Sequence, residues 1–516
     1  MFNLCNLYKL KAPRSVATAM RGRSPRWRWL VAGGGALLAM AGVGAALAWS
    51  LIFDSVLASH LALVPNSRSY QSWLAPNVPL YFEVYLFNWT NADMFPMEKP
   101  NLEQLGPYRF LEKRQHVNVT WHRNNGTLGF RTLHSWHFDP TSNGTLEDNI
   151  TTLNAIAASA VYRSRFWGFF QQKGLSMGLA LFGQQMAVSR LAGELLFEGY
   201  EDPLLEFAKT LPPSTTGGAP QVDRFGWFYE RNNSLDIDGY MEVTTGEHGG
   251  TLPGQIVRWN HNYRLPYYSG NCGQLLGSAG EFMPRNLTEE SELLMFSPDL
   301  CRTVVMDYMD SGVHNGLQYH KYGITARSFD NSTFSSENTC FCNGACEWSG
   351  VMNVSACRFG SPAFISLPHF LHGDPQLRDL VTGMDPDPEK HSFYFAVEPR
   401  LGVPVDVSGR FQLNLYLEAN PHVALYEHVP KMLFPILWVQ QRVIIDDAIV
   451  AELLMVRSVL DWGGIVCAGA ALAFAIIATV ASCCSNTKKR KYSKPCDLFK
   501  TCDKLKDDAE LKLNSM

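Results

Sequence analysis

Residues 30–53 read LVAGGGALLAMAGVGAALAWSLIF, a run of 24 residues without a charged side chain. As a helix that rises about 1.5 Å per residue, the run would be about 36 Å long, and the hydrocarbon core of a bilayer is about 30 Å thick. Trp27 and Trp29 precede the run and Trp49 lies near its end, where indole rings favour the headgroup region. The stretch therefore predicts a membrane-spanning helix.

The residues before this run are basic. Residues 1–29 carry seven Lys and Arg side chains, and no acidic residue occurs before Asp54. The alternative to a retained helix is a cleaved signal peptide, because Ala46-Leu47-Ala48 resembles a small-residue cleavage site. A 29-residue leader and a 24-residue apolar run are both long for a signal peptide, so we expect the helix to be retained.

A second uncharged stretch covers residues 463–484 and is followed by the basic residues 488–491. Because basic flanks stay in the cytosol, we expect cytosolic tails at 1–29 and 485–516, membrane helices at 30–53 and 463–484, and a domain outside the cytosol at 54–462. Glycosylation sequons are used only in the secretory lumen, and all nine lie in that domain. They begin at Asn88, Asn118, Asn125, Asn143, Asn149, Asn232, Asn286, Asn331 and Asn353. This topology predicts a plasma-membrane protein with two spans.

The twelve cysteines form two sets of six. The set in the outer domain comprises Cys272, Cys301, Cys340, Cys342, Cys346 and Cys357. An even number of clustered cysteines in an oxidising compartment predicts disulfides, here three. The alternative is a zinc site at Cys340, Cys342 and Cys346, although a second ligand pair with the usual spacing is missing. In the other set, Cys483 and Cys484 are either palmitoylation sites or ordinary cysteines at a helix end.

The outer domain carries the pattern of a mainly β structure. Its candidate strands alternate apolar and polar residues or are rich in β-branched and aromatic residues. They are Leu80–Trp89, Arg109–Trp121, Leu128–Phe138, Phe393–Val397 and Arg410–Glu418. Turns rich in Gly, Pro and Asn separate them, which favours an antiparallel architecture of the α+β class. Leu211–Pro220, LPPSTTGGAP, reads as a loop or a weak boundary.

The exception is Asn154–Tyr200, which is helix-prone, basic and apolar. No acidic residue occurs from Asn149 to Gly193. The centre of the helix-prone stretch holds the pairs Phe166-Trp167 and Phe169-Phe170. Together with Arg163, Arg165 and Lys173, these rings would suit an anionic amphiphile, whose chain gains burial while its headgroup meets positive charge. The alternative is a helical hairpin that packs one apolar face on the core and leaves its arginines in solvent.

Enzyme motifs are weak in this chain. Residues 174–178 match the G-x-S-x-G nucleophile elbow around Ser176, but an elbow needs a preceding strand, and here the preceding segment is helix-like. We find no phosphate-binding loop, zinc-protease helix or dinucleotide fingerprint, so we expect no catalytic residue, metal or cofactor. The formal net charge of −4 does not favour nucleic acid as a partner.

Several short segments together resemble the class B scavenger receptors, the family that includes the fatty acid translocase, the high-density lipoprotein receptor and the lysosomal integral membrane protein. The resemblance covers nearly the whole chain and includes the two-span topology. The matching segments are Gly106-Pro107-Tyr108, Glu194-Leu195-Leu196 through Gly199-Tyr200 to Asp202-Pro203, Cys340-Phe341-Cys342, Ser366-Leu367-Pro368-His369-Phe370-Leu371, Glu398-Pro399 and Pro435-Ile436-Leu437-Trp438.

This resemblance implies an antiparallel β-barrel outer domain with an apical bundle of short helices and an internal lipid tunnel. It implies disulfides that pair Cys272 with Cys340, Cys301 with Cys357 and Cys342 with Cys346. The family's lipid-accepting apical lysine does not align cleanly, and Lys173 is the lysine nearest to its place. The resulting candidates for ligand binding are Arg163, Arg165, Phe166, Phe169 and Lys173.

The function implied is that of a cell-surface receptor that binds fatty acids, sterol esters, carotenoids, lipoproteins or other polyanionic particles and passes lipid to the membrane. The alternatives are a recognition or adhesion receptor for apoptotic cells or microbes, a lysosomal enzyme escort, and a sensory co-receptor for hydrophobic odorants. Homo-oligomer formation is left open by the sequence.

Overall fold

The computed structural model describes residues 25–76, 79–212, 221–247, 251–333, 336–342 and 346–484, with side chains described between Gly33 and Val480. The chain divides into two compact units, Met1–Ser55 with Met455–Met516 (unit 1) and Val56–Leu454 (unit 2). Most of the predicted amino-terminal tail, the whole carboxy-terminal tail, residues 213–220 of the linker-like stretch, and the side chains of Cys483 and Cys484 lie outside these descriptions.

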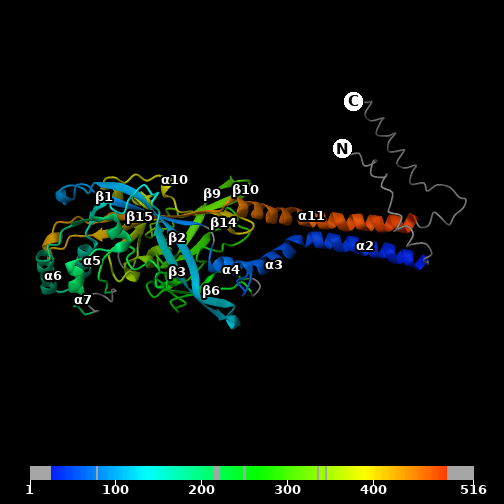
Figure 1. Ribbon diagram of the computed structural model, residues 1–516, viewed down its shortest axis with the longest axis horizontal. Coiled ribbons are helices and arrows are strands. Elements are labelled where there is room, and N and C mark those ends of the chain that lie inside the picture. Colours follow the sequence, from blue (N-terminus) through cyan, green and yellow to red (C-terminus); the bar gives the residue numbers. More distant parts are fainter. Residues whose placement is uncertain are drawn as a thin grey trace, which may run out of the picture. The chain divides into compact units, whose positions relative to one another are not determined.

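Unit 2 is built on one large antiparallel sheet (Figure 1). Its strand order is β7-β6-β3-β2-β1-β15-β14-β13-β10-β9-β8, with β12 and then β11 branching from β14. Every strand pair in this path is antiparallel. The bounds are β1 Leu80–Trp89, β2 Leu102–His122, β3 Thr127–Phe138, β6 Tyr240–Thr244, β7 Ile256–Trp259, β8 Leu293–Ser297, β9 Arg302–His314, β10 Leu317–Gly323, β11 Val351–Asn353, β12 Ala363–Ser366, β13 Tyr394–Glu398, β14 Val403–Leu417 and β15 Met432–Ile444. The predicted α+β class with an antiparallel sheet is confirmed.

The two outermost strands of the sheet, β7 and β8, are linked through one short segment. Ser278 forms an antiparallel bridge with Gln255, next to β7, and a parallel bridge with Met295 of β8. The Ser278 N–H donates to the carbonyl of Leu294 at 3.2 Å, and the Phe296 N–H donates to the carbonyl of Ser278 at 2.8 Å. These bridges make the sheet a nearly closed barrel.

Strand β14 shows how its residue pattern gives the sheet two different faces. Ser408, Arg410, Gln412 and Asn414 are buried and polar, and they alternate with the half-buried residues Val407, Phe411 and Leu413. Because side chains point to opposite faces at every second residue, one face of the strand is polar and the other apolar. Phe411 and Val407 pack in a cluster with apolar residues of β8, β9, β10 and β13.

The polar face of β14 is covered by chain that contains a stacked pair of histidines. The rings of His369 and His391 lie 4.3 Å apart at 16°. The side-chain oxygen Oε1 of Gln412 accepts from the backbone N–H of His369 at 2.7 Å, and Arg410 donates to the backbone carbonyls of Glu389 and Ser392 at 3.0 Å. Burial lowers the pKa of both histidines to about 4, and for His391 the neighbouring His369 lowers it further. The rings are therefore neutral at pH 7.

A second buried polar group lies between β2, β3 and the chain before β6. His134 of β3 is 2.8 Å from Glu112 of β2 through Nδ1 and 2.8 Å from Asp238 through Nε2. Burial alone would lower the pKa of His134, but the hydrogen bonds to Asp238 and Glu112 outweigh it and raise the pKa to about 9. His134 is therefore a buried cation held between two carboxylates.

The helices α5 (Ala155–Ser164), α6 (Phe169–Leu181) and α7 (Pro203–Lys209) gather at one end of unit 2 (Figure 1). Helix α4 (Arg68–Leu74) lies away from them, against β2. The prediction of helix across residues 154–200 is only partly right. Residues Ala187–Leu191 form strand β5, which pairs with β4 (Asn149–Leu153), because Val188 and the β-branched Thr151 and Thr152 suit an extended ladder.

Three disulfides join Cys272 to Cys340, Cys301 to Cys357 and Cys342 to Cys346. These are the pairs that the family pattern implies. All three cysteines of the zinc alternative are therefore occupied by disulfide bonds, and that alternative is wrong.

Unit 1 contains helix α2 (Pro25–Leu47), the start of α3 (Trp49–Leu61) and most of α11 (Asp447–Cys484). Within the described residues, α11 is long and apolar enough to cross a membrane, and α2 with α3 passes the same test only as a pair bent by 64°. The predicted span over 30–53 is thus helical on both sides of a break at Ala48. At the bend, the Trp49 indole N–H donates to the backbone carbonyls of Val459 and Leu460 of α11 at 3.1 Å.

Helices α2 and α11 approach closely where both have small side chains. A Cβ atom added to Gly42 would lie 2.2 Å from the Cβ of Ala471, and one added to Gly35 would lie 3.4 Å from the Cβ of Ala478. Glycine at these positions lets the two backbones pack, as in many membrane helix pairs.

Candidate functional site

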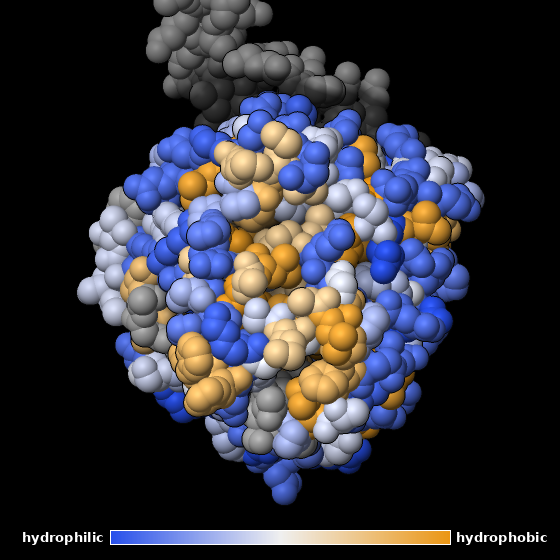
Figure 2. Space-filling model, turned by 90° about the vertical axis from the view of Figure 1, so that its left-hand side faces the viewer, coloured by the Kyte–Doolittle hydropathy of each residue, from blue (hydrophilic) through white to orange (hydrophobic). Residues whose placement is uncertain are grey.

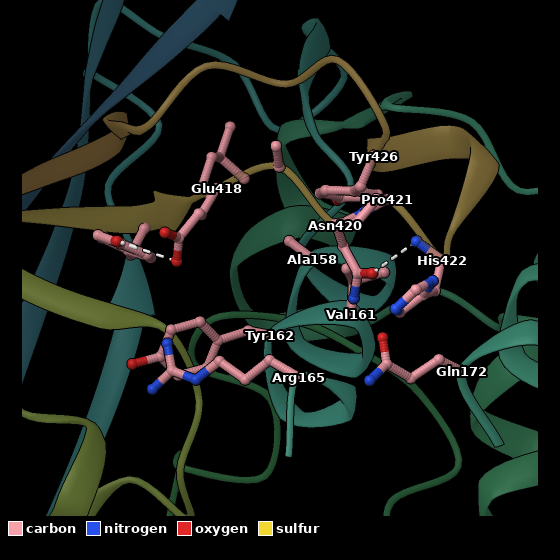
Figure 3. A pocket seen from close by; sticks show the side chains of 13 residues that line it. Ala158, Val161, Tyr162, Arg165, Gln172, Glu418, Asn420, Pro421, His422 and Tyr426 are labelled. Carbon is pink, nitrogen blue, oxygen red and sulfur yellow. Dashed lines mark hydrogen bonds between the residues drawn. The ribbon is translucent and has the colours of Figure 1, made fainter. Parts of the chain in front are cut away.

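A pocket of about 250 Å³ lies between α5, α6 and the segment that follows β14 (Figure 3). Helix α5 supplies Ala158, Val161 and Tyr162, α6 supplies Gln172, and residues 416–422 with Tyr426 close the opposite wall. The third element includes the short 3-10 helix η9 (Ala424–Tyr426). The pocket thus joins parts of the chain about 250 residues apart in sequence.

Local sequence explains the position of α5. The Asn154 side chain caps the helix by accepting a hydrogen bond from the Ala157 N–H at 3.0 Å. The helix then buries small and aliphatic side chains, Ala155, Ile156, Ala157, Ala158 and Val161. Since one face is held in the core, Tyr162 at the end of the helix is directed to the pocket (Figure 3).

The cation of the pocket is Arg165, which follows α5. Its guanidinium carbon lies 3.6 Å from the centre of the Tyr162 ring and 4.7 Å from that of Phe166. The Tyr162 ring in turn contacts the Tyr416 ring edge-on, with centroids 5.8 Å apart. Stacking on aromatic rings positions this charge without neutralising it, and no described carboxylate lies within ion-pair distance of Arg165. It is free to meet an anionic group.

The opposite wall carries hydrogen-bonding groups. The Tyr416 hydroxyl donates to the Glu418 carboxylate at 3.2 Å, and burial, followed by the charges of Glu347 and Glu418, raises the pKa of Tyr416. The His422 N–H donates to the Asn420 side chain at 3.0 Å (Figure 3). The wall therefore offers polar groups opposite the cationic side chain of Arg165.

Next to the pocket, large apolar side chains are exposed to solvent. Figure 2 looks onto this end of unit 2 and shows apolar side chains in groups among hydrophilic ones. The residues of this apical apolar surface are Phe166, Phe169, Phe170, Met177 and Leu181, of which Phe170 is 86% and Phe166 80% exposed. Large apolar side chains gathered and exposed in this way are typical of a binding surface.

The CD36 family model matches residues 33–485. The chain belongs to the CD36 family. It is 37% identical to protein peste of Drosophila melanogaster over 84% of this chain and 78% of that one. It is 32% identical to scavenger receptor class B member 1 of Cricetulus griseus, over 81% of this chain and 82% of that one, and 28% identical to lysosome membrane protein 2 of Homo sapiens, over 78% and 82%. The resemblance to class B scavenger receptors is thus confirmed.

The CD36-family chain brings together only part of the predicted ligand-binding set. Arg165 lines the pocket, Phe166 lies under its guanidinium, and the Phe169 ring contacts His422 with centroids 5.2 Å apart. Lys173 is exposed, with Nζ 6.0 Å from the Phe169 ring. Arg163 points elsewhere: its guanidinium lies beside Gly360, and burial lowers its pKa.

Ser176 has a structural position. It lies inside α6 rather than between a strand and a helix, so the geometry of a nucleophile elbow is absent. Its hydroxyl accepts a hydrogen bond from the Ala424 N–H at 3.0 Å, which ties α6 to η9.

Sequence reasoning missed the opposite wall. Tyr416, Glu418, His422 and Tyr426 reach the pocket only because β14 ends beside α5. Residues 419–422, Ala-Asn-Pro-His, mark a turn after a strand, and that signal could have identified the segment as a loop but not as a neighbour of α5.

The asparagines of the nine sequons lie at different depths. Asn118, Asn125, Asn143, Asn149, Asn232 and Asn286 are exposed, whereas Asn88, Asn331 and Asn353 are half-buried. The Asn88 side-chain oxygen accepts from the Thr151 N–H at 2.9 Å, so this side chain also serves the fold.

Proposed function

We propose that the chain is a cell-surface receptor that captures lipids and lipid particles at the apical pocket and passes lipid through unit 2 into the membrane. The observation that carries the proposal is Arg165, a cation that has no carboxylate partner among the described residues and is stacked on aromatic rings beside exposed apolar side chains. An amphiphile with an anionic headgroup would bury its chain on that surface while its headgroup meets the guanidinium.

A second observation supports transfer rather than capture alone. The apolar face of β14, with Val407, Phe411 and Leu413, is only half-buried although it packs within large hydrophobic clusters. We propose that this face lines an apolar tunnel. A lipid that moves along it need not expose its chain to water, where each methylene costs about 0.8 kcal/mol.

The topology proposed with this function keeps the expected segments: tails at 1–29 and 485–516 in the cytosol, spans at 30–53 and 463–484, and the domain 54–462 outside. The bent pair α2–α3 would form the first span and α11 the second. We also propose that the exposed sequons carry glycans and that Cys483 and Cys484 are palmitoylated. The candidate ligand contacts are Arg165, Phe166 and Phe169, with Lys173 as an accessory charge.

The test is uptake of labelled fatty acid, cholesteryl ester and carotenoid by cells that display equal amounts of each variant. Val407→Trp places a bulky ring on the apolar face of β14, and Val313→Trp makes the same change at a position of β9 that is 65% exposed. We expect Val407→Trp to abolish uptake while ligand still binds, and Val313→Trp to behave as the wild type. Equal uptake by both variants would remove the tunnel from the proposal.

An adhesion receptor that binds particles without transferring lipid is the second candidate. It is favoured by the exposure of Phe166 and Phe170, which offer a docking surface independent of any tunnel. In the same experiment, this function predicts that particles bind and that no lipid enters the cell with the wild type. A third candidate, an enzyme escort in lysosomes, would instead place the wild type in lysosomes on fractionation.

A further inference from the structure

A larger cavity, of about 370 Å³, lies in a different part of unit 2. It is formed by β8, β9 and two 3-10 segments, η5 (Gly270–Gly273) and η6 (Ser336–Phe341), which the disulfide Cys272–Cys340 joins. Its lining is mixed: Leu276, Leu294 and Val305 are apolar, whereas Asn271, Gln274 and Asn338 carry amides. None of its lining residues belongs to the apical pocket.

The wall of this cavity contains a buried arginine without an acidic partner. Arg302, the first residue of β9, is only 6% exposed and also lines the smaller neighbouring cavity of about 30 Å³. Its guanidinium carbon lies 3.5 Å from the centre of the Phe341 ring, and Nη2 donates to the carbonyl of Ser328 at 3.2 Å. Nε is buried without a hydrogen-bond partner, and no carboxylate among the described residues lies within ion-pair distance.

The charge of Arg302 persists at neutral pH. Burial lowers its pKa to about 10, which still leaves the guanidinium protonated at pH 7. A buried cation with one hydrogen bond and an orphan N–H is costly, because the protein replaces only part of its hydration. A ring face and one carbonyl offset some of this cost, and the adjoining cavity leaves space for a counter-charge.

The acidic residues of the same cavity do not supply that counter-charge. Asp307 accepts from the Thr325 hydroxyl at 2.5 Å and lies 3.6 Å from Arg327, which also pairs with Glu292 at 3.0 Å, so its contacts are with groups other than Arg302. Glu337 is exposed and not in ion-pair distance of Arg302. Among the described residues, Arg302 therefore has no carboxylate partner.

We propose that this cavity binds a small oxyanion, a carboxylate or a phosphate group, which pairs with Arg302. The volume lies within the usual range for small-molecule sites, about 300–1,000 Å³. The side-chain amides of Asn271, Gln274 and Asn338 can donate to the remaining oxygens, and the apolar wall accommodates a short alkyl chain. The site is separate from lipid capture at the apical pocket, since it draws on other elements of unit 2.

The experiment follows the thermal unfolding midpoint of the full-length, detergent-solubilised protein with sodium phosphate, acetate or hexanoate at constant ionic strength, with sodium chloride as the reference. We expect a saturable rise of about 1–3 °C at tenfold the dissociation constant. A response to phosphate alone assigns a phosphate ligand, and one that grows from acetate to hexanoate assigns an alkyl carboxylate.

Variants separate a built site from a general salt effect. Arg302→Gln removes the charge and should lose the rise, whereas Arg68→Gln removes an arginine that is 83% exposed and should keep it. Asn338→Asp is designed to place a carboxylate beside Arg302, so it should raise the midpoint without added anion and abolish the response. The proposal is overturned if no anion gives a saturable rise, or if Arg302→Gln or Asn338→Asp responds as the wild type does.

Discussion

The guanidinium carbon of Arg165 lies 3.6 Å from the centre of the Tyr162 ring, so the cation of the apical pocket is held by an aromatic face rather than by a carboxylate. Replacing Arg165 by Gln should weaken binding to vesicles that contain anionic lipid by roughly two- to fivefold, as expected for one exposed charge contact. Flotation with such vesicles measures the effect.

Two controls define that result. Arg165→Lys keeps the charge but loses the planar stack, and should fall between wild type and Arg165→Gln. Arg224→Gln removes an arginine already paired with Glu201 at 2.9 Å and should bind as the wild type. A loss that is as large for Arg224→Gln would show that only net charge is being sensed.

Acid should destabilise unit 2 through the stacked histidines. The pKa of His369 and of His391 is about 4 in the folded protein and 6.5 in the unfolded chain. The unfolded chain therefore binds more protons between these values, so the stability due to neutral rings is complete above about pH 6.5 and is lost as the pH falls toward 4. Unfolding by denaturant at a series of pH values should show this decline, on the order of 3 kcal/mol for each histidine.

The His369→Gln variant should show a shallower decline over the same range. His428→Gln changes an exposed histidine and serves as the control, which should leave the slope unchanged. If His369→Gln and the wild type lose stability in parallel, the stacked pair does not determine the acid sensitivity.

His134 predicts the opposite dependence. Its pKa is raised from 6.5 to about 9 by Asp238 and Glu112 in spite of burial. Its contribution to stability is therefore complete below pH 6.5 and is lost as the pH rises through about 9. The difference in stability between the wild type and His134→Gln should shrink between pH 7 and pH 10; a constant difference would mean that the histidine acts through packing alone.

The disulfides should differ in their contribution to stability. Cys272–Cys340 joins residues 68 apart and Cys342–Cys346 joins residues 4 apart. In the chain-entropy description, the long loop contributes about 4 kcal/mol and the short one about 2 kcal/mol. Paired Cys→Ser variants compared by thermal unfolding should follow this order, and an equal loss would point to packing around the sulfurs instead.

Local patterns predicted much of the sheet. The expected strand Leu80–Trp89 coincides with β1, and Leu128–Phe138 lies within β3, because alternation and aromatic content are properties of the segment itself. Strand β15 was missed. Residues 432–438 are all buried, and such a run without alternation can equally be read as part of a buried helix.

The sequence predicted only one wall of the apical pocket. Arg165 and Phe166 stand out because they lie in a basic and aromatic segment. The opposite wall, with Tyr416 and His422, comes from the end of β14 and the segment after it. The importance of Arg302 depends on which carboxylates fail to reach it, and that is decided by tertiary packing. A sequence pattern carries no such information.

The two bridges of Ser278 also affect how this chain can associate with other chains. Strands at an open sheet edge present unpaired N–H and C=O groups that invite other chains to add to the sheet and seed aggregates. Here the outermost strands are tied to each other through Ser278, which covers part of both edges and reduces this risk. Copies that meet along these two edges would then associate mainly through side chains, so their contacts can be changed by single substitutions without rebuilding the barrel.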